Sequence, residues 1–319
     1  MPKLKSSARI LYVIYFGMTV LELLLLLAGK MPFFDALCTS FGTAGTGGFG
    51  IKNDSIGSYT PYLQWVTTIF MILFGVNFNA YYFILFRQVK RALRMEEVRY
   101  YFLIIAASTG IIFISLMQNA MKAADALRHS AFQVASIITT TGFSTADFDL
   151  WSQTSKTVLV FLMFIGACAG STGGGIKVSR IVILLKTVKK EMNSYLHPKS
   201  IQKINFEDKP VAHEVVRAVN VYFITFVVLF SASIFLLSLE GKDLITNFTA
   251  VAATINNIGP GLALVGPTQN FGIFSTGSKF VLMFDMLAGR LELFPLLILF
   301  HPGIIKEFLP GRPSRKRKN

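Results

Sequence analysis

Long apolar stretches alternate with short ones along the chain, and the alternation occurs three times. A helix needs about 20 apolar residues to cross the hydrocarbon core of a bilayer. Six stretches reach that length: residues 8–29, 62–86, 98–119, 155–176, 214–239 and 276–301. Each pair of them encloses an apolar run that is too short to cross, namely Phe33–Phe41, Leu127–Ile138 or Leu244–Ile255. The pattern predicts an all-α integral membrane protein with six spans and three re-entrant half-helices.

The three occurrences divide the chain into similar units. Each unit contains a span, a half-helix, a Gly-rich turn and a second span, and the turns align at Gly48, Gly142 and Gly259. We therefore expect repeat A at residues 1–94, repeat B at 95–198 and repeat C at 199–308, with a basic tail at 309–319. The stretch 189–213 is the longest polar segment and is too short for a domain, so it suits a docking segment.

Composition and charge support a membrane protein and orient it. The chain is 53% hydrophobic and 15% charged, whereas soluble domains carry about 25% charged residues. Its net charge of +14 is concentrated at the N-terminus, in every second loop and at the C-terminus. By the positive-inside rule, these segments and both termini face the cytoplasm. Because the basic residues border spans, we expect contact with membrane lipid and not with nucleic acid.

The Gly-rich turns are candidate cation sites. A half-helix that stops inside the membrane ends in unpaired carbonyls and a partial negative charge, which favour a cation. Glycine lets the following backbone aim carbonyls at one axis, as in potassium selectivity filters. Ordinary turns between spans are the alternative, which three turns in matching places disfavour. The candidate ion-binding residues are Thr46, Gly47 and Gly48; Thr139, Thr140, Thr141 and Gly142; and Asn256, Asn257, Ile258 and Gly259.

A run of small residues interrupts the fourth span at Gly170–Lys177. A phosphate-binding loop would need adjacent Gly and Lys, but Ile176 lies between Gly175 and Lys177. Two alternatives remain, a helix-packing face of small residues and a flexible plug below the turns. Successive glycines favour the plug, because a packing face would keep its glycines at helical spacing.

Arg290 lies in the strongly apolar sixth span. An arginine at membrane depth costs roughly 2.5–3.5 kcal/mol on insertion scales, so a functional role is the default hypothesis. It either forms a structural pair with Glu292 or Asp285, or lies under the turns near the Gly-rich run. In the latter place it would add an electrostatic barrier and hold the run by hydrogen bonds.

Other polar residues leave their roles open. Glu22 in the first span either faces a neighbouring unit or extends outward, and Asn77 and Asn79 either line a path or bond between helices. The outer acids Asp54, Asp147 and Asp149 either concentrate cations or are solvated loop residues. The four histidines have no ligand spacing, and no carboxylate or histidine cluster suggests an enzyme, so we expect no catalytic residues, no metal site other than potassium at the turns, and no cofactor.

Four motifs resemble those of one family. Thr139–Phe143 is similar to a filter of the Trk/Ktr superfamily of potassium transporters. In the TrkH branch of that superfamily, Asn256–Gly261 resembles the last filter, Gly166–Lys177 the intramembrane gating loop, and Ala288–Phe294 the final-span motif. The four motifs occur in the right order, and the resemblance covers essentially the whole chain.

The resemblance implies a potassium uptake pore of the bacterial inner membrane. Its gate would comprise Arg290, Lys177 and the loop residues Gly170, Ser171, Thr172, Gly173, Gly174 and Gly175. The family has four repeats in a pseudo-fourfold arrangement, and this chain starts at what resembles the second, so one repeat is missing or is supplied by a separate chain. The family also implies a homodimer and a cytosolic nucleotide-binding regulatory subunit. A non-transporting shortened subunit and a sodium-selective or sodium-coupled transporter stay open as alternatives.

Overall fold

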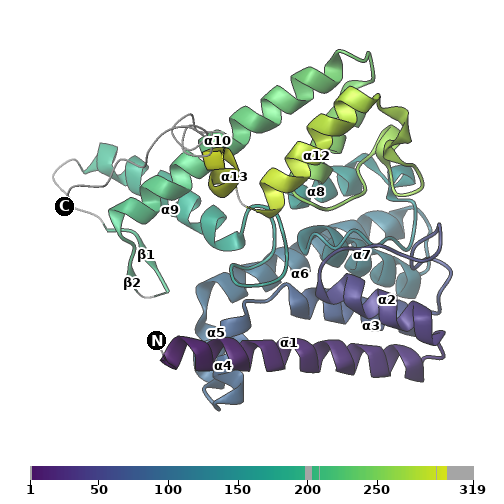
Figure 1. Cartoon of the computed structure of the whole chain (residues 1–319), viewed down its shortest axis with the longest axis horizontal. Coiled ribbons are helices and arrows are strands. Elements are labelled where there is room, and N and C mark those ends of the chain that lie inside the picture. Colours follow the sequence, from purple (N-terminus) through teal and green to yellow (C-terminus); the bar gives the residue numbers. More distant parts are fainter. Residues whose placement is uncertain (1, 198–202, 208, 292, 300–319) are drawn as a thin grey trace, which may run out of the picture.

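The computed structural model describes residues 2–197, 203–207, 209–291 and 293–299 (Figure 1). The helices and strands in chain order are α1 (Pro2–Ala28), α2 (Phe33–Ala44), α3 (Pro61–Phe74), α4 (Phe78–Leu85), α5 (Val89–Arg94), α6 (Glu96–Gln118), α7 (Ala123–Ile138), η1 (Phe148–Leu150), α8 (Gln153–Phe164), α9 (Val178–Leu196), β1 (Asn205–Phe206), β2 (Lys209–Pro210), α10 (His213–Ser238), α11 (Leu244–Ile255), η2 (Ala263–Val265), η3 (Phe271–Ile273), α12 (Thr276–Arg290) and α13 (Leu293–Leu299). The chain is thus mainly helical, as predicted.

The first span of each predicted unit is one continuous helix. Within the described residues, three helices are long and apolar enough to cross a bilayer: Ala8–Ala28 of α1, Glu96–Gln118, and His213–Ser238. Their outer faces are apolar; on α1, for example, Tyr12, Val13 and Phe16 are exposed. Because lipid and not water would contact such a face, these helices have the surface of membrane spans.

The second spans are broken, and for residues 62–86 and 276–301 the prediction of an unbroken stretch was wrong. Between α3 and α4 the chain bends by 91°. A Cβ atom added to Gly75 would lie 2.3 Å from the hydroxyl oxygen of Tyr101, which donates to the Ile72 carbonyl at 3.0 Å. In the sixth stretch, α12 ends at Arg290 and α13 begins at Leu293. The fourth stretch breaks after Phe164, ahead of the interruption by small residues that the sequence predicted at Gly170–Lys177.

The half-helices α2, α7 and α11 lie at the predicted places. The bounds of α11 match the prediction, whereas α2 continues to Ala44 and α7 begins at Ala123. Each follows a residue in the left-handed region three positions before its start, at Lys30, Ala120 or Gly241. The same tight reversal therefore leads from each continuous span into its half-helix.

The three units lie in chain order across the molecule (Figure 1). Helices α1 to α3 form one edge, α6 to α8 the middle, and α10 to α12 the opposite edge. The largest core cluster surrounds the middle unit and includes Tyr101, Ile112, Val134, Ile137 and Leu159. The middle unit therefore holds most of this cluster and lies between the other two.

A small polar region extends from the end of α9. The sequence predicted a soluble stretch at 189–213; the structure continues α9 to Leu196 and forms an antiparallel hairpin of β1 and β2. Lys186 of α9 joins the hairpin to α6, since its Nζ lies 2.5 Å from Glu96 and donates to the Asn205 carbonyl at 2.7 Å.

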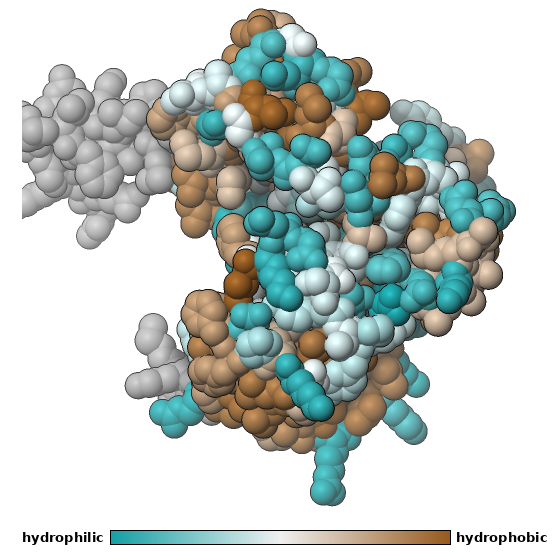
Figure 2. Space-filling view, turned by 90° about the vertical axis from the view of Figure 1, so that its right-hand side faces the viewer, coloured by the Kyte–Doolittle hydropathy of each residue, from teal (hydrophilic) through white to brown (hydrophobic). Residues whose placement is uncertain are grey.

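The predicted tail 309–319 and residues 300–308 of repeat C lie outside the described residues. In Figure 2, hydrophilic residues cross the middle of one face between hydrophobic areas.

Candidate functional site

The three Gly-rich turns have the same backbone geometry. Each half-helix ends in a residue with helical dihedrals, and the next residue is left-handed: Thr46 (φ 50°), Thr140 (φ 57°) or Asn257 (φ 57°). Two positions later a glycine also has positive φ: Gly48 (66°), Gly142 (87°) or Gly259 (107°). The intervening amide donates back to the half-helix in all three turns, as Thr141 does to the Ser136 carbonyl at 2.9 Å. The turns are therefore equivalent in structure, with the glycines at matching positions.

The turns stand next to one another in chain order. A Cβ atom on Gly48 would lie 1.7 Å from the Thr141 carbonyl oxygen, and one on Gly142 would lie 1.9 Å from that of Ile258. Only glycine fits such an approach. At Gly259, by contrast, no atom of the described residues lies within 4 Å of an added Cβ. The turns thus form an open arc that runs from the first unit through the second to the third.

Hydroxyl groups fix the middle turn. Thr139, Thr140 and Thr141 are fully buried. The Thr139 hydroxyl donates to the Ala135 carbonyl at 2.6 Å. It also lies 2.8 Å from the Thr141 hydroxyl, and either hydroxyl can be the donor of that hydrogen bond. Thr140 Oγ1 accepts from the Gly174 amide at 2.6 Å. The threonine side chains of the middle turn therefore bond to protein.

The asparagine Nδ2 groups of the third turn also bond to protein, whereas the buried Asn256 Oδ1 has no hydrogen-bond partner among the described residues. Asn256 Nδ2 donates to the Ala252 carbonyl at 3.0 Å, and Asn257 Nδ2 donates to the Met286 carbonyl at 3.1 Å. Gly289 of α12 packs against this turn so closely that a Cβ would lie 1.8 Å from the Ile255 carbonyl oxygen. No such role for Gly289 was predicted from the sequence; it is the residue that lets α12 reach the turn.

The Gly-rich loop at 165–177 lies against the turns. Gly166 donates to the Ile176 carbonyl at 2.7 Å and closes the loop at its base. A Cβ on Gly173 would lie 3.1 Å from the Thr139 carbonyl oxygen, and one on Gly174 would lie 3.0 Å from that of Asn256. The loop therefore touches the start of the second and third turns, which favours the plug over a helix-packing face.

The loop also joins the break between α3 and α4. The Cys168 amide donates to the Gly75 carbonyl at 3.0 Å, and the Phe78 amide donates to the Gly170 carbonyl at 3.1 Å. Asn77 caps α4 by accepting from the Asn79 amide at 3.0 Å, and its Nδ2 bonds between helices by donating to Glu97 of α6 at 3.2 Å. Two interrupted spans thus meet beside the turns.

Arg290 bridges the first turn and the loop. Its Nη2 donates to the Gly45 carbonyl at 3.1 Å, and its Nη1 lies 3.4 Å from both the Thr46 hydroxyl and the Thr172 carbonyl. The interpretation of Arg290 as the partner of Asp285 was wrong, because Asp285 accepts from the Ser233 hydroxyl at 2.8 Å. Glu292 lies outside the described residues. A cation at Gly45 is favourable, because the carbonyl end of α2 carries a partial negative charge.

A cavity of about 520 Å³ opens beside the loop. Three basic side chains line it, Lys177, Arg180 and Arg290, together with Gly45 and the loop residues 170–175. The Lys177 ammonium donates to the loop carbonyls of Gly173 and Gly174. All of the predicted gate residues therefore lie together, next to the turns.

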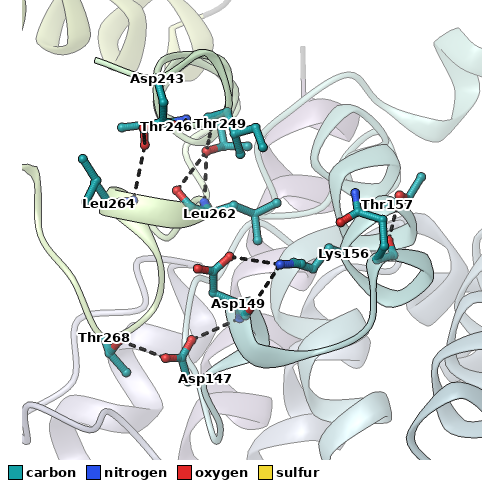
Figure 3. Close-up of polar contacts among 12 residues, drawn as sticks. Asp147, Asp149, Lys156, Thr157, Asp243, Thr246, Thr249, Leu262, Leu264 and Thr268 are labelled. Carbon is teal, nitrogen blue, oxygen red and sulfur yellow. Dashed lines mark hydrogen bonds and ion pairs between the residues drawn. The ribbon is translucent and has the colours of Figure 1, made fainter. Parts of the chain in front are cut away.

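The outer acids bond within the protein. Asp147 caps η1 and accepts from the Thr268 hydroxyl of the third unit at 3.1 Å, and Asp149 lies 3.7 Å from Lys156 (Figure 3). Asp54 accepts weakly from Ser58 at 3.4 Å. These contacts favour a structural role in loops over a role in concentrating cations.

Asp243, which sequence analysis passed over, caps α11. It accepts from the Thr246 hydroxyl at 2.6 Å (Figure 3). That hydrogen bond holds the pKa of the Asp243 carboxyl below its usual range. The cap fixes the outer end of the third half-helix.

Glu97 is a further residue that sequence analysis missed. Two adjacent acids at the head of an apolar span, Glu96 and Glu97, resemble an ordinary charged first turn. In the structure Glu97 is 1% exposed and accepts from amides of the loop region.

Glu22 is also fully buried, on the face of α1 toward the first half-helix. Among the described residues, no three His, Cys, Asp or Glu side chains gather in a way that could hold a metal ion.

Comparison with known proteins gives one consistent result. The family model described as "TrkH: Cation transport protein" matches residues 1–304. The Trk system potassium uptake proteins TrkH of Salmonella typhimurium and Escherichia coli K12 are each 33% identical to the chain, covering 96% of it and 64% of their own length. The crystal structure of the potassium transporter TrkH from Vibrio parahaemolyticus matches with a TM-score of 0.87 at 32% identity, covering 95% of this chain and 66% of that one. The chain thus spans just under two thirds of these relatives.

Proposed function

Because the chain belongs to the TrkH family of cation transport proteins, we propose that it forms the ion-conducting part of a potassium uptake system in the bacterial inner membrane. The family comprises transporters and not enzymes, with potassium as substrate and no cofactor. Inward flow would be driven by the membrane potential, worth about 2.3 kcal/mol per unit charge per 100 mV.

The arc of three equivalent turns is the observation that carries this proposal. Carbonyls at the end of each half-helix offer oxygen ligands that replace the water around a monovalent cation. The close contacts of Gly48 with Thr141 and of Gly142 with Ile258 hold neighbouring turns at a fixed separation. We propose that the ion is held by backbone carbonyls of residues 46–48, 139–142 and 256–259, since the threonine hydroxyls and the asparagine Nδ2 groups of the turns bond to protein.

We propose that the Gly-rich loop and Arg290 form the gate. Support comes from the hydrogen bonds of Arg290 to Gly45 and Thr172 and of Gly174 to Thr140, which fasten the loop against the turns. Lys177 adds a second positive charge at the loop. A potassium ion that has left the turns would meet these two charges, so conduction requires the loop and Arg290 to move aside.

The proposal extends to the arrangement in the cell. We propose that both termini face the cytoplasm, because the basic clusters at the termini and in every second loop would then follow the positive-inside rule. We propose that the complete assembly has four filter-bearing units around one axis, because three turns in an open arc do not enclose a pore. We further propose a homodimer with a cytosolic nucleotide-binding regulatory subunit that docks on the basic cytoplasmic segments.

Growth of an uptake-deficient bacterium in low potassium tests the function. The chain would be expressed alone and together with the N-terminal third of a TrkH relative, and rubidium uptake would be measured in both strains. We expect growth and uptake in at least the second strain, with potassium preferred over sodium in competition. If the membrane-inserted protein supports neither in either strain, the proposed function is wrong.

A further inference from the structure

Glu97 makes an unusual set of hydrogen bonds for a residue at the head of a membrane helix. Its Oε1 accepts from the Ala169 amide at 2.6 Å and from the Ser179 amide at 3.1 Å. Its Oε2 accepts from Asn77 Nδ2 at 3.2 Å. The side chain is almost completely buried. Buried carboxylates are costly unless such bonds satisfy them, so this position is built around the charge.

The partners of Glu97 come from both interrupted spans. Ala169 lies near the start of the Gly-rich loop, and Ser179 lies in the first turn of α9, directly after the loop. Asn77 caps α4, after the break that follows α3. The carboxylate therefore lies at the N-termini of α4 and α9, where partial positive charges stabilise an anion. No residue in its own segment is needed to keep it there.

The loop is thereby held at both of its ends by one carboxylate. Its middle is held by the turns, through Gly174 to Thr140 and Thr172 to Thr46. A displacement of the loop away from the turns must therefore also break the bonds to Glu97 or move α6 with it. A glutamine at this position would turn an NH₂ group toward amide donors, which leaves a mismatch that a carboxylate avoids.

We propose that Glu97 is a positioning residue that holds the Gly-rich loop against the turns and joins it to the break at Asn77, so that the two interrupted spans move together. The description of the loop as a gate rests on the proposed function above. The positioning itself does not, and it is tested separately from transport.

The native Cys168 reports on the loop directly. It is buried and precedes Ala169, the residue whose amide bonds to Glu97. The chain has two cysteines, so Cys168 is the sole thiol in a Cys38→Ala background. The experiment measures the rate at which N-ethylmaleimide labels Cys168 in the purified full chain. Losing charge-assisted bonds at the loop ends should raise the rate about tenfold or more in Glu97→Gln.

Glu96→Gln is the matched control. It makes the same chemical change one residue away, at a side chain that pairs with Lys186 and not with the loop. We expect the control to label at the parent rate. A second control measures Cys38 in a Cys168→Ala background, because general loosening would raise labelling of both thiols. Faster labelling confined to Cys168 and to Glu97→Gln supports the proposal; equal rates in the two glutamine variants, or equal acceleration at both thiols, overturn it.

If Glu97→Gln does not give monodisperse protein, Glu97→Asp takes its place. The shorter carboxylate cannot reach both Ala169 and Asn77, so we expect faster Cys168 labelling than in the parent, and the parent rate would overturn the proposal. Rubidium leak through the complete transporter is measured in parallel. Faster labelling without greater leak would leave Glu97 as a positioning residue and remove the loop from the gate.

Discussion

Of the two spans in each unit, the first is a single helix and the second is interrupted. The continuous helices α1, α6 and α10 have between 23 and 27 residues, whereas the helices that open the second spans, α3, α8 and α12, have 14, 12 and 15. The interrupted helices begin with side-chain caps, at Thr60, Ser152 and Ser275. No side-chain cap begins α6 or α10.

This difference shows which spans depend on specific hydrogen bonds to other parts of the protein. A long apolar helix satisfies nearly all of its backbone groups internally and needs only lipid or apolar neighbours. Each interruption frees backbone groups at membrane depth, and these must be bonded within the protein. The break at Gly75 bonds to the 165–177 loop, and that loop and Gly289 next to Arg290 contact the three turns. The interrupted spans therefore carry the site, and the continuous spans frame it.

The largest effect that this comparison predicts is at glycine. Gly142→Ala should abolish rubidium uptake by the complete transporter, because the residue has a φ of 87° and its Cβ would lie 1.9 Å from the Ile258 carbonyl oxygen. Strain of this kind costs on the order of 1–3 kcal/mol before the clash is counted. Gly17→Ala in the continuous α1 is the control, since a Cβ there meets no described atom within 4 Å. Full uptake in Gly142→Ala would show that the contact between neighbouring turns is not required.

The continuous spans and half-helices could be predicted because their signals are local. About 20 apolar residues predict a span, and an apolar run of half that length before a Gly-rich turn predicted α2, α7 and α11. The structure places Gly48, Gly142 and Gly259 in the same backbone conformation, as their alignment in the sequence leads one to expect. Assignment of these turns and of the loop to ion binding and gating stays a prediction.

The interruptions at Gly75 and Arg290 could not be predicted, because their causes are distant in sequence. Gly75 breaks its helix where the Tyr101 hydroxyl from the next unit approaches it. Glu97 has the sequence signature of a solvated first turn, and its burial depends on loop amides 72 and 82 residues away. Arg290 was singled out by its charge, but its partners Gly45 and Thr172 follow only from the packing of all three units.

A smaller effect is expected at the charge that ends α12. Arg290→Ala removes a cation from the contact between the first turn and the loop, and leaves the Thr172 carbonyl bonded to the Thr46 hydroxyl alone. Removing one such charge changes the energy of a passing cation by roughly 1 kcal/mol, so we expect about a fivefold rise in rubidium leak. Arg217→Ala, at an exposed arginine of the continuous α10, is the control and should leave leak unchanged. Equal leak in the two variants would take Arg290 out of the gate.

The smallest effect concerns the outer cap of α12, where a continuous span meets an interrupted one. Glu240, just after α10, accepts from the hydroxyl and the amide of Ser275. These bonds, and chiefly the one from the Ser275 hydroxyl, hold the pKa of the Glu240 carboxyl below its usual value. A carboxyl with a lowered pKa stabilises the folded state above its unfolded pKa of about 4.3, and that contribution is lost as the pH falls through the folded-state pKa.

Melting temperatures of the detergent-solubilised chain between pH 7 and pH 3 test this cap. The parent should lose stability below about pH 5 more steeply than Glu240→Gln, which cannot titrate. Ser275→Ala should lower stability at pH 7 by about 1 kcal/mol, the usual cost of losing a helix cap, and should also flatten the dependence on pH. Glu214→Gln, at the start of the uncapped α10, is the control and should follow the parent curve. A Glu240→Gln curve parallel to that of the parent would mean that α12 does not depend on this cap at its N-terminus. The difference between continuous and interrupted spans would then rest only on the breaks at the C-terminal ends of α3, α8 and α12.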